Sequence, residues 1–415
     1  MTPEIKQRIE QIRRGEVPER YVKTALGLAP ANWKRYTFGD IYTERKEPGD
    51  ENLPLLMVSI HSGVSDGEVD AAELPKQVKR IEDKSQYKKA VSGDLVFNMM
   101  RAWQGAIGTV RTTGMVSPAY IVAEPNDKAY PLFMDYYSRT PQMINQIDRQ
   151  SYGVTDFRKR LYWDSFAPIS CALPPIEEQQ KIAAILTTQD RVIELKEKCL
   201  AEKQRQKKYL MQQLLTGKKR LPGFNGAWKT DCLGKLFFER KETNCENIEM
   251  LAITGTQGII PRKELDLKDN SSEDKSKYLR VCVGDIGYNT MRMWQGVSAY
   301  SNYEGIVSPA YTILKPSSSI NAKYFAYLFK MSEIVFLFYR FSQGLVDDTR
   351  NLKYENFKKI KVCYPPDIKE QTAIAEVLSA ADREIELLQQ DIEQEKQKKK
   401  ALMQLLLTGI VRVKT

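Results

Sequence analysis

Residues 174–217 read PPIEEQQKIAAILTTQDRVIELKEKCLAEKQRQKKYLMQQLLTG, and this stretch decides the fold. Two prolines open it, as suits a first helical turn, and neither proline nor glycine recurs before Gly217, a typical C-terminal stop. A helix of this length would extend about 60 Å at 1.5 Å per residue. That is too long for an ordinary helix packed inside one domain. The stretch therefore predicts a spacer helix.

The same pattern returns at residues 365–409, which read PPDIKEQTAIAEVLSAADREIELLQQDIEQEKQKKKALMQLLLTG. After a one-residue insertion, apolar residues match at alternating three- and four-residue steps, the pattern of a coiled-coil seam. A one-sided seam needs a partner, and the other copy is the obvious one. The alternative is two separate amphipathic helices, each packed on its own domain. The predicted seam consists of Ile182, Leu186, Ile193, Leu200, Leu210, Leu214, Ile374, Leu378, Ile385, Ile392, Leu402 and Leu406.

Composition limits the class of protein. The 415 residues are enough for two or three domains, and 42% hydrophobic content supports real cores. An excess of 63 Lys+Arg over 53 Asp+Glu, a net charge of +10, favours a polyanionic partner. The cysteines lack CxxC spacing, which predicts reduced thiols in a cytoplasmic protein. The single histidine, His61, argues against a histidine-rich metal site or a histidine-based triad, and no metal site is predicted.

Two globular regions accompany the helices. Residues 3–14 predict a short helix, and residues 33–171 alternate short apolar runs with turns, as strands do. Residues 228–364 repeat this region, and their most apolar run, 324–341, contains charges that indicate a core helix rather than a membrane span. The sequence thus predicts an α+β chain: residues 1–173 (N-terminal lead and first domain), 174–217 (central helix), 218–364 (second domain) and 365–415 (C-terminal helix).

The internal repeat is the strongest signal in the chain. The motif M-R-x-W-Q-G is followed by V-S-P-A-Y in residues 100–120, and again with the same gap in residues 291–311. Gly93-Asp94 recurs as Gly284-Asp285. Two copies of one unit can be related by an approximate two-fold axis, with the long helices antiparallel. Two basic modules at a fixed separation suit duplex DNA read at two half-sites.

These motifs carry a resemblance to a known family. The PP(x)IxEQ helix starts, the LLTG helix ends, the GD-[LI] strands and the tandem order resemble the specificity (S) subunit of a Type I restriction–modification system over the whole chain. The resemblance implies that each globular region is a target-recognition domain for half of a split DNA site, with the helices setting the unread gap. It also implies two modification subunits that supply S-adenosylmethionine and methylate an adenine in each half-site, and a translocase–nuclease restriction subunit.

The residues agree that the chain is not itself the catalyst. It lacks the [ND]PPY motif of an adenine methyltransferase, and LPPI at Leu173 and YPPD at Tyr364 are helix starts. It has neither GxGxxG nor GxxxxGK[ST], so no cofactor is predicted in this chain. Two alternatives remain: a stand-alone two-site DNA-binding or architectural protein, and a coiled-coil scaffold without nucleic acid.

The candidate DNA contacts come from three places. The M-R-x-W-Q-G motif combines groups that clamp phosphate, stack or read a base edge, unless its tryptophan packs in the core and its polar residues brace a turn. Its identity in both copies favours framework or phosphate contact over discrimination. Arginine–lysine pairs before the strands are phosphate contacts or solvated charges, and arginines lie in the SYGVTDFRKR and SQGLVDDTRNL loops. The candidates are Arg45, Lys46, Arg101, Trp103, Gln104, Arg158, Arg160, Arg240, Lys241, Arg292, Trp294, Gln295 and Arg350.

The parts that differ between the copies are residues 53–89 and 247–277. If the two half-sites differ, these stretches are expected to hold the discriminating contacts. His61 is interpreted as a loop residue. The lysine run 396–400 is interpreted as a solvated face that also meets a partner or the DNA backbone.

Overall fold

The computed structural model describes residues 3–24, 27–61, 63–65, 67, 86–153, 155, 158–245, 248–255, 258–265 and 274–413. The chain divides into two compact units. Unit 1 combines Met1–Leu195 with Ile392–Thr415, and unit 2 is Lys196–Asp391. Both long helices begin in one unit and end in the other, so each unit contains segments far apart in the sequence.

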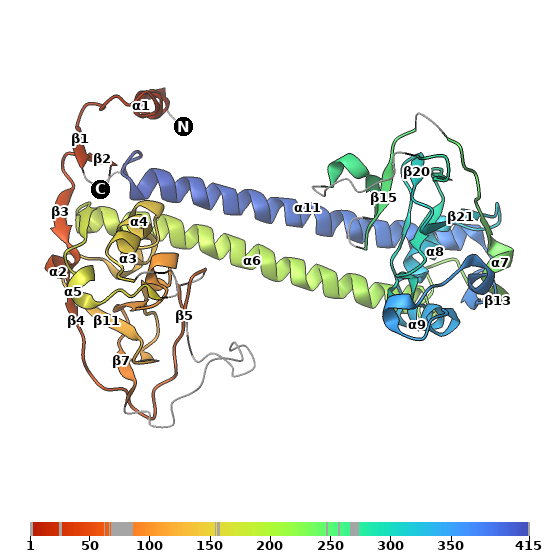
Figure 1. Ribbon diagram of the computed structural model, residues 1–415, viewed down its shortest axis with the longest axis horizontal. Helices are drawn as coiled ribbons and strands as arrows, with labels where there is room; N and C mark the ends of the chain where they lie inside the picture. Colours follow the sequence, from red (N-terminus) through yellow and green to blue (C-terminus); the bar gives the residue numbers. More distant parts are fainter. Residues whose placement is uncertain are drawn as a thin grey trace. The chain divides into compact units, whose positions relative to one another are not determined.

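The strands of unit 1 form small antiparallel sheets around a central four-stranded one (Figure 1). They are β1 (Tyr21–Thr24), β2 (Gly27–Pro30), β3 (Lys34–Thr37), β4 (Tyr42–Glu44), β5 (Val58–Ser59), β6 (Gly63–Val64), β7 (Lys88–Ala90), β8 (Leu95–Asn98), β9 (Ile107–Thr109), β10 (Gly114–Val116), β11 (Tyr120–Pro125) and β12 (Ser170–Leu173). The central order is β4-β11-β8-β9, and the other strands form the two-stranded sheets β1-β2, β3-β12, β5-β6 and β7-β10. Among the short apolar runs of residues 33–171, residues 54–60 yield only the short β5, whereas residues 93–100 and 118–125 yield β8 and β11.

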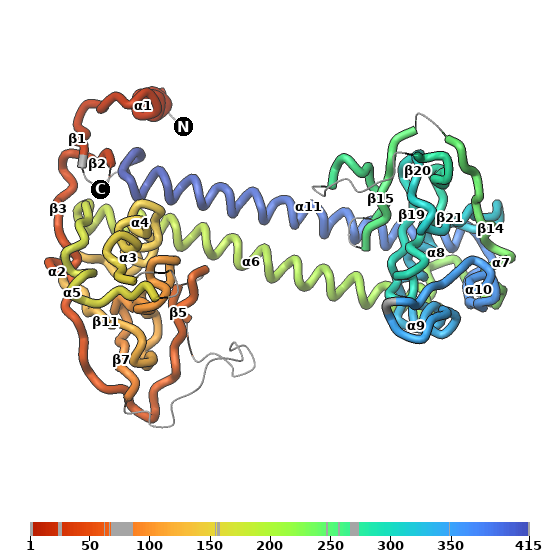
Figure 2. The backbone as a smooth tube through the Cα atoms, in the orientation of Figure 1, coloured from red at the N-terminus to blue at the C-terminus, as the bar shows by residue number. Residues whose placement is uncertain are grey.

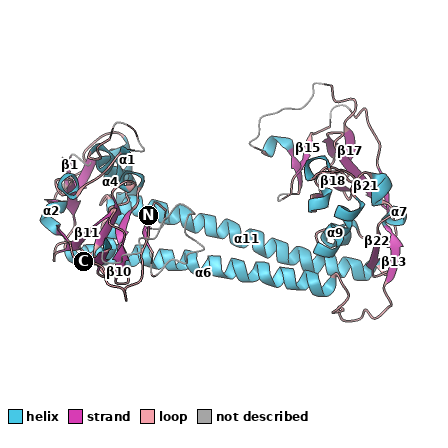
Figure 3. Ribbon diagram, turned by 60° about the horizontal axis from the view of Figure 1, so that its bottom comes forward, coloured by secondary structure: helices cyan, strands magenta, loops and turns pink. Residues whose placement is uncertain are grey.

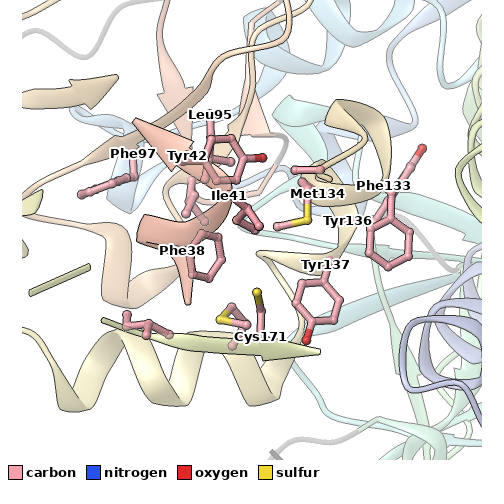
Figure 4. Packing of buried hydrophobic residues seen from close by; sticks show 14 of the residues in the cluster. Phe38, Ile41, Tyr42, Leu95, Phe97, Phe133, Met134, Tyr136, Tyr137 and Cys171 are labelled. Atoms are coloured by element: carbon pink, nitrogen blue, oxygen red, sulfur yellow. The ribbon is translucent and has the colours of Figure 1, made fainter. Parts of the chain in front are cut away.

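The central sheet is buried on both faces, which explains its uninterrupted apolar strands. Phe97 and Ile121 belong to one hydrophobic cluster, whereas Val96 and Val122 belong to the other, as the period of two in a strand requires. The larger cluster is aromatic, and Figure 4 shows Phe38, Tyr42 and Phe97 gathered above the strand that carries Cys171.

Of the short helices in unit 1, all but the N-terminal one bury side chains in this larger cluster. The short helices are α1 (Pro3–Arg13), α2 (Phe38–Ile41), α3 (Pro131–Tyr137), α4 (Pro141–Arg149) and α5 (Trp163–Phe166). The segment after β11 forms two helices rather than one, because Pro141 suits the first turn of a new helix better than the interior of an old one. The expected N-terminal helix is confirmed as α1.

Unit 2 repeats the topology of unit 1. Its strands are β13 (Lys229–Cys232), β14 (Phe237–Glu239), β15 (Leu251–Ile253), β16 (Ile259–Pro261), β17 (Leu279–Val281), β18 (Ile286–Asn289), β19 (Ser298–Tyr300), β20 (Gly305–Val307), β21 (Tyr311–Pro316) and β22 (Lys361–Tyr364). Its helices are α7 (Leu233–Leu236), α8 (Ala322–Leu328), α9 (Ser332–Phe341) and α10 (Tyr354–Phe357). The central order β14-β21-β18-β19 matches that of unit 1, so the predicted internal repeat is confirmed. Figure 3 shows two of these strands, β18 and β21.

The two long helices are present as predicted. α6 spans Ile176–Leu214 with 39 residues, and α11 spans Ile368–Leu407 with 40. In unit 1, Gln189 donates to Glu395 and Lys399 pairs with Asp190. In unit 2, the ion pairs Lys196–Asp391, Lys203–Glu384 and Lys207–Asp382 likewise join the two helices. Rising residue numbers on one helix meet falling numbers on the other, so the helices run antiparallel within each unit.

The predicted seam positions are all buried or half-buried. Contact between the two helices is not the only cause of this burial. Ile182 and Leu186 belong to the aromatic cluster of unit 1, and Ile374 and Leu378 belong to its counterpart in unit 2. The other helix contributes to the same clusters, with Leu406 in unit 1 and Leu214 in unit 2. The interpretation of these residues as a simple two-helix seam is therefore incomplete, since the ends of each helix also form domain core.

The C-terminal segment completes unit 1. Tyr21 Oη donates to the carbonyl of Gly409 at 2.6 Å, and Arg8 donates to that of Ile410 at 2.9 Å. Figure 2 shows the end of α11 beside β1 and β2. Within the described residues, no helix is long and apolar enough to cross a membrane. The apolar run 324–341 is α8 and α9, and both helices contribute to the unit 2 core.

Candidate nucleic-acid interface

The repeated arginines Arg45 and Arg240 are framework residues. Arg45 Nε lies 2.8 Å from Asp94 Oδ2, and Arg240 Nε lies 2.8 Å from Asp285 Oδ2. The side chains of Arg45 and Arg240 are only 12% and 10% exposed, and the hydrogen bonds that they donate to these carboxylates raise the pKa of each guanidinium. The alternative that these arginines are merely solvated is wrong, because each is held by a buried aspartate, whereas their contact with phosphate stays a prediction. The recurrence of Gly-Asp in the sequence is explained by the same pairs.

The adjacent lysines remain candidates for phosphate contact. Lys46 and Lys241 are 78% and 76% exposed, and each pairs with the glutamate two residues before it, Glu44 (16% exposed) or Glu239 (25% exposed). A lysine head group this exposed gains little from its ion pair and can exchange it for a DNA phosphate. Phosphate contact at these two positions therefore stays a prediction.

The contrast between Arg240 and Lys241 predicts two separable effects. K241A should lower the slope of log binding constant against log salt by about 1, with unchanged stability, because one phosphate contact is lost. R240K should lower stability instead, since a lysine cannot reproduce the two-pronged bond to Asp285. Salt titrations of DNA binding and thermal melts of both variants separate the roles. An unchanged salt slope for K241A would remove Lys241 from the interface.

The M-R-x-W-Q-G motif forms the same tight turn in both units. In unit 1 it is the 3-10 helix η2 (Ala102–Gln104), and in unit 2 it is η5 (Met293–Gln295). The indole N–H of Trp103 donates to the Met100 carbonyl, as that of Trp294 does to Met291. The tryptophans are half-buried and brace the turn, whereas the arginine and glutamine side chains stay exposed. Arg101, Gln104, Arg292 and Gln295 are thus free to face a ligand, while the tryptophans have a structural role.

A cation packs on each of these tryptophans. Lys159 Nζ lies 4.8 Å from the centre of the Trp103 ring, and the Arg350 guanidinium lies 6.0 Å from that of Trp294. Arg350 also lies 4.1 Å from the Tyr339 ring. The residue of unit 1 that corresponds to Arg350 is therefore Lys159, which sequence reasoning missed in favour of Arg158 and Arg160. Spacing from the repeated glycines, Gly153 and Gly344, was the signal that could have found it.

The cation sits in a loop that is closed at its base. Gln343 and Asn351 exchange two backbone hydrogen bonds of 2.8 and 2.7 Å, and Tyr152 and Arg160 do the same in unit 1. Gly344 has φ +138°, and a Cβ there would meet the Arg350 Cα at 2.7 Å. Glycine is therefore required for the chain to close on itself. Arg158 is exposed and Arg160 is half-buried in the unit 1 loop.

In each unit, the globular domain is fixed to both long helices by one matched network. In unit 1, Tyr136 Oη donates to Asp190 on α6 at 2.6 Å, and Lys399 on α11 pairs with the same carboxylate. In unit 2, Tyr327 Oη donates to Asp382 on α11 at 2.6 Å, and Lys207 on α6 pairs with it. Lys399, which belongs to the lysine run 396–400 interpreted as a solvated face, thus forms an ion pair within the chain. The network determines how the loop-bearing domain is oriented on its helices.

The stretches expected to discriminate between half-sites are only partly described. Residues 62, 66, 68–85, 247, 256–257 and 266–273 lie outside the described residues, and the prediction stays untested. His61 is exposed in a turn, and its backbone N–H donates to the Ser59 hydroxyl. All the cysteines are free.

The fold and the candidate interface define a tandem-repeat protein in which two equivalent domains, each with one cation-bearing loop, share a pair of long helices. The chain belongs to the family described as Type I restriction modification DNA specificity domain, whose model matches residues 72–205 and 234–397. The resemblance drawn from the helix starts and ends is thereby confirmed. Each matched segment begins in a recognition domain and ends in the long helix that follows it.

Individual relatives agree with the family. A protein named as the specificity subunit of the type I restriction enzyme MjaX from Methanocaldococcus jannaschii is 24% identical, and the match covers 96% of this chain and 98% of that protein. The type I restriction enzyme MjaVIII specificity subunit from the same organism is 25% identical over 80% of this chain and 83% of its own length. The crystal structure of a type I restriction-modification system S subunit from M. genitalium has a TM-score of 0.54 at 12% identity, covering 92% of this chain and 97% of that one. This structural likeness supports the α+β fold.

Proposed function

We propose that this chain is the non-catalytic DNA-specificity subunit of a Type I restriction–modification complex, and that it reads a split DNA site with one half-site per unit. The observation that carries the proposal is the duplication of one complete site. Each unit has the same turn, the same closed loop and the same tyrosine–aspartate–lysine network. Two equivalent faces suit a ligand that is itself read at two places.

The proposal extends to partners that supply the chemistry. Two modification subunits dock on the chain and carry S-adenosylmethionine, and each methylates an adenine in one half-site after that base leaves the stack. A translocase–nuclease restriction subunit joins for cleavage. The assembly acts on cytoplasmic DNA, in agreement with the reduced thiols that the sequence predicts. The family membership and the names of the relatives support this role.

The test is methylation by the reconstituted complex. The purified chain alone should bind DNA in a salt-dependent way but transfer no methyl group, and addition of its modification subunit should produce methylation at one split sequence. Genome-wide mapping of methylated adenines measures the outcome. Salt-dependent binding without any methylation in the complex would favour the stand-alone DNA-binding protein. Absence of DNA binding would favour the scaffold.

A further inference from the structure

The closed loop of unit 2 holds an apolar side chain in an unusual position. Leu345 is 100% exposed, and its neighbour Val346 is 58% exposed. A single exposed leucine needs no explanation by itself. This one lies in a loop that also carries Arg350, and Arg350 packs on Trp294 in the turn η5.

The loop that carries Leu345 is held by hydrogen bonds at its base and within its tip. Its base is closed by the paired Gln343 and Asn351, and the Thr349 N–H donates to the Val346 carbonyl at 3.0 Å within the tip. Arg350 bonds to Asp347 at 3.3 Å and to the Tyr339 hydroxyl at 3.3 Å. The exposed leucine is therefore presented in a fixed place, and little conformational entropy remains to be lost on binding.

The loop is also joined to the turn that bears Arg292 and Gln295. The Leu352 N–H at its end donates to the Thr290 carbonyl at 2.8 Å. In the sequence an apolar residue follows the loop glycine in both copies, as Gly153-Val154 and Gly344-Leu345, although the rest of the two loops differs. An apolar tip between cations and an amide is the composition of a wedge that enters the base stack of DNA.

We propose that Leu345 is a wedge that enters the base stack of the half-site read by unit 2 and fills the space left by the extruded target base. This proposal rests on the proposed function. Extrusion of a base costs stacking energy, and an apolar side chain in the vacated space offsets part of that cost. The exposed Arg292 neutralises a phosphate beside the opened step, while Arg350, whose side chain is 15% exposed, holds the loop in place. Leu345 is thus a positioning residue for the methyl-transfer reaction, which takes place in the partner.

The test uses the complete complex with its modification subunit and a duplex that carries one split site. Methylation rates at the two adenines are measured separately. L345A should slow one half-site by ten-fold or more and leave the other within two-fold, while L345M stays within three-fold of the wild type at both. L345Q, of similar size but polar, should behave like L345A. V283A, which removes another exposed side chain of unit 2 (63% exposed), should leave both rates unchanged.

A duplex with a missing base opposite the slowed adenine isolates the wedge from other roles. Its stack is already open, so L345A should recover to within three-fold of the wild type. The proposal is overturned if L345A slows methylation equally at both half-sites, or if its rate is no lower than that of V283A. It is also overturned if L345A does not recover on the opened duplex. If the wild-type complex methylates no split site, the proposed function itself fails, and that result is distinct from all of these.

Discussion

Replacing Arg220 by methionine should destabilise unit 2 by about 3–5 kcal/mol, because it leaves a buried carboxylate without its cation. Glu370 is 3% exposed in the first turn of α11, and Arg220 binds both of its oxygens at 2.6 and 2.7 Å. The same arginine donates to the Gly226 carbonyl and packs on Trp228. Hydrogen exchange of the backbone amides in β18 and β21 measures the loss locally.

Unit 1 offers a matched variant because it contains the same pair. Arg412 binds both oxygens of Glu178, which is 1% exposed in the first turn of α6. R412M should therefore weaken protection in β8 and β11 while sparing β18 and β21, the reverse of R220M. R205M removes an exposed pair with Glu202 (74% and 68% exposed) and should cost less than 1 kcal/mol. Equal losses for R205M and R220M would contradict the argument from burial.

The sequence predicted the architecture because the architecture is repeated. Two copies of a motif such as M-R-x-W-Q-G align without any knowledge of contacts, and the long helices follow from the absence of proline and glycine between Pro175 and Gly217. The same repetition identified Arg45 and Arg240 as important, but it could not give the reason. A framework arginine and a phosphate-binding arginine look alike in sequence, and only the buried partners Asp94 and Asp285 distinguish them.

The parts that sequence reasoning missed depend on three-dimensional closure. Lys159 takes the place of Arg350 because both loops close at equivalent pairs of backbone hydrogen bonds. The residue types in the loops do not indicate this closure. Arg412 completes a pair with Glu178 from the far end of the chain, whereas Arg220 reaches Glu370 from the link that follows α6. Both arginines lie three residues after the glycine that ends a long helix, Gly217 or Gly409, so alignment of the two copies matches them. The alignment does not show that each arginine pairs with a glutamate at the start of the other long helix.

Lengthening both long helices should widen the gap between the two methylated half-sites without changing their sequences. We expect four residues inserted after Lys198 and four after Gln390 to add about 6 Å to each helix. This corresponds to one or two base pairs at about 3.4 Å each. The cross-helix pairs support this choice of site. Lys196–Asp391 lies on one side of both insertions and Lys203–Glu384 lies on the other, so both pairs survive.

The insertions also keep the helices approximately in phase, because four residues nearly complete a turn of 3.6. Insertion after Lys198 alone is the control. It displaces the partners of one pair relative to those of the other, so Lys196–Asp391 and Lys203–Glu384 cannot form together, and the complex should lose activity. Mapping methylated adenines with the double insertion gives the new gap directly. An active double variant that retains the original gap would show that the helices do not set the distance between half-sites. A wider gap with unchanged half-sites means that α6 and α11 set this distance, while the two loop-bearing domains determine the half-site sequences.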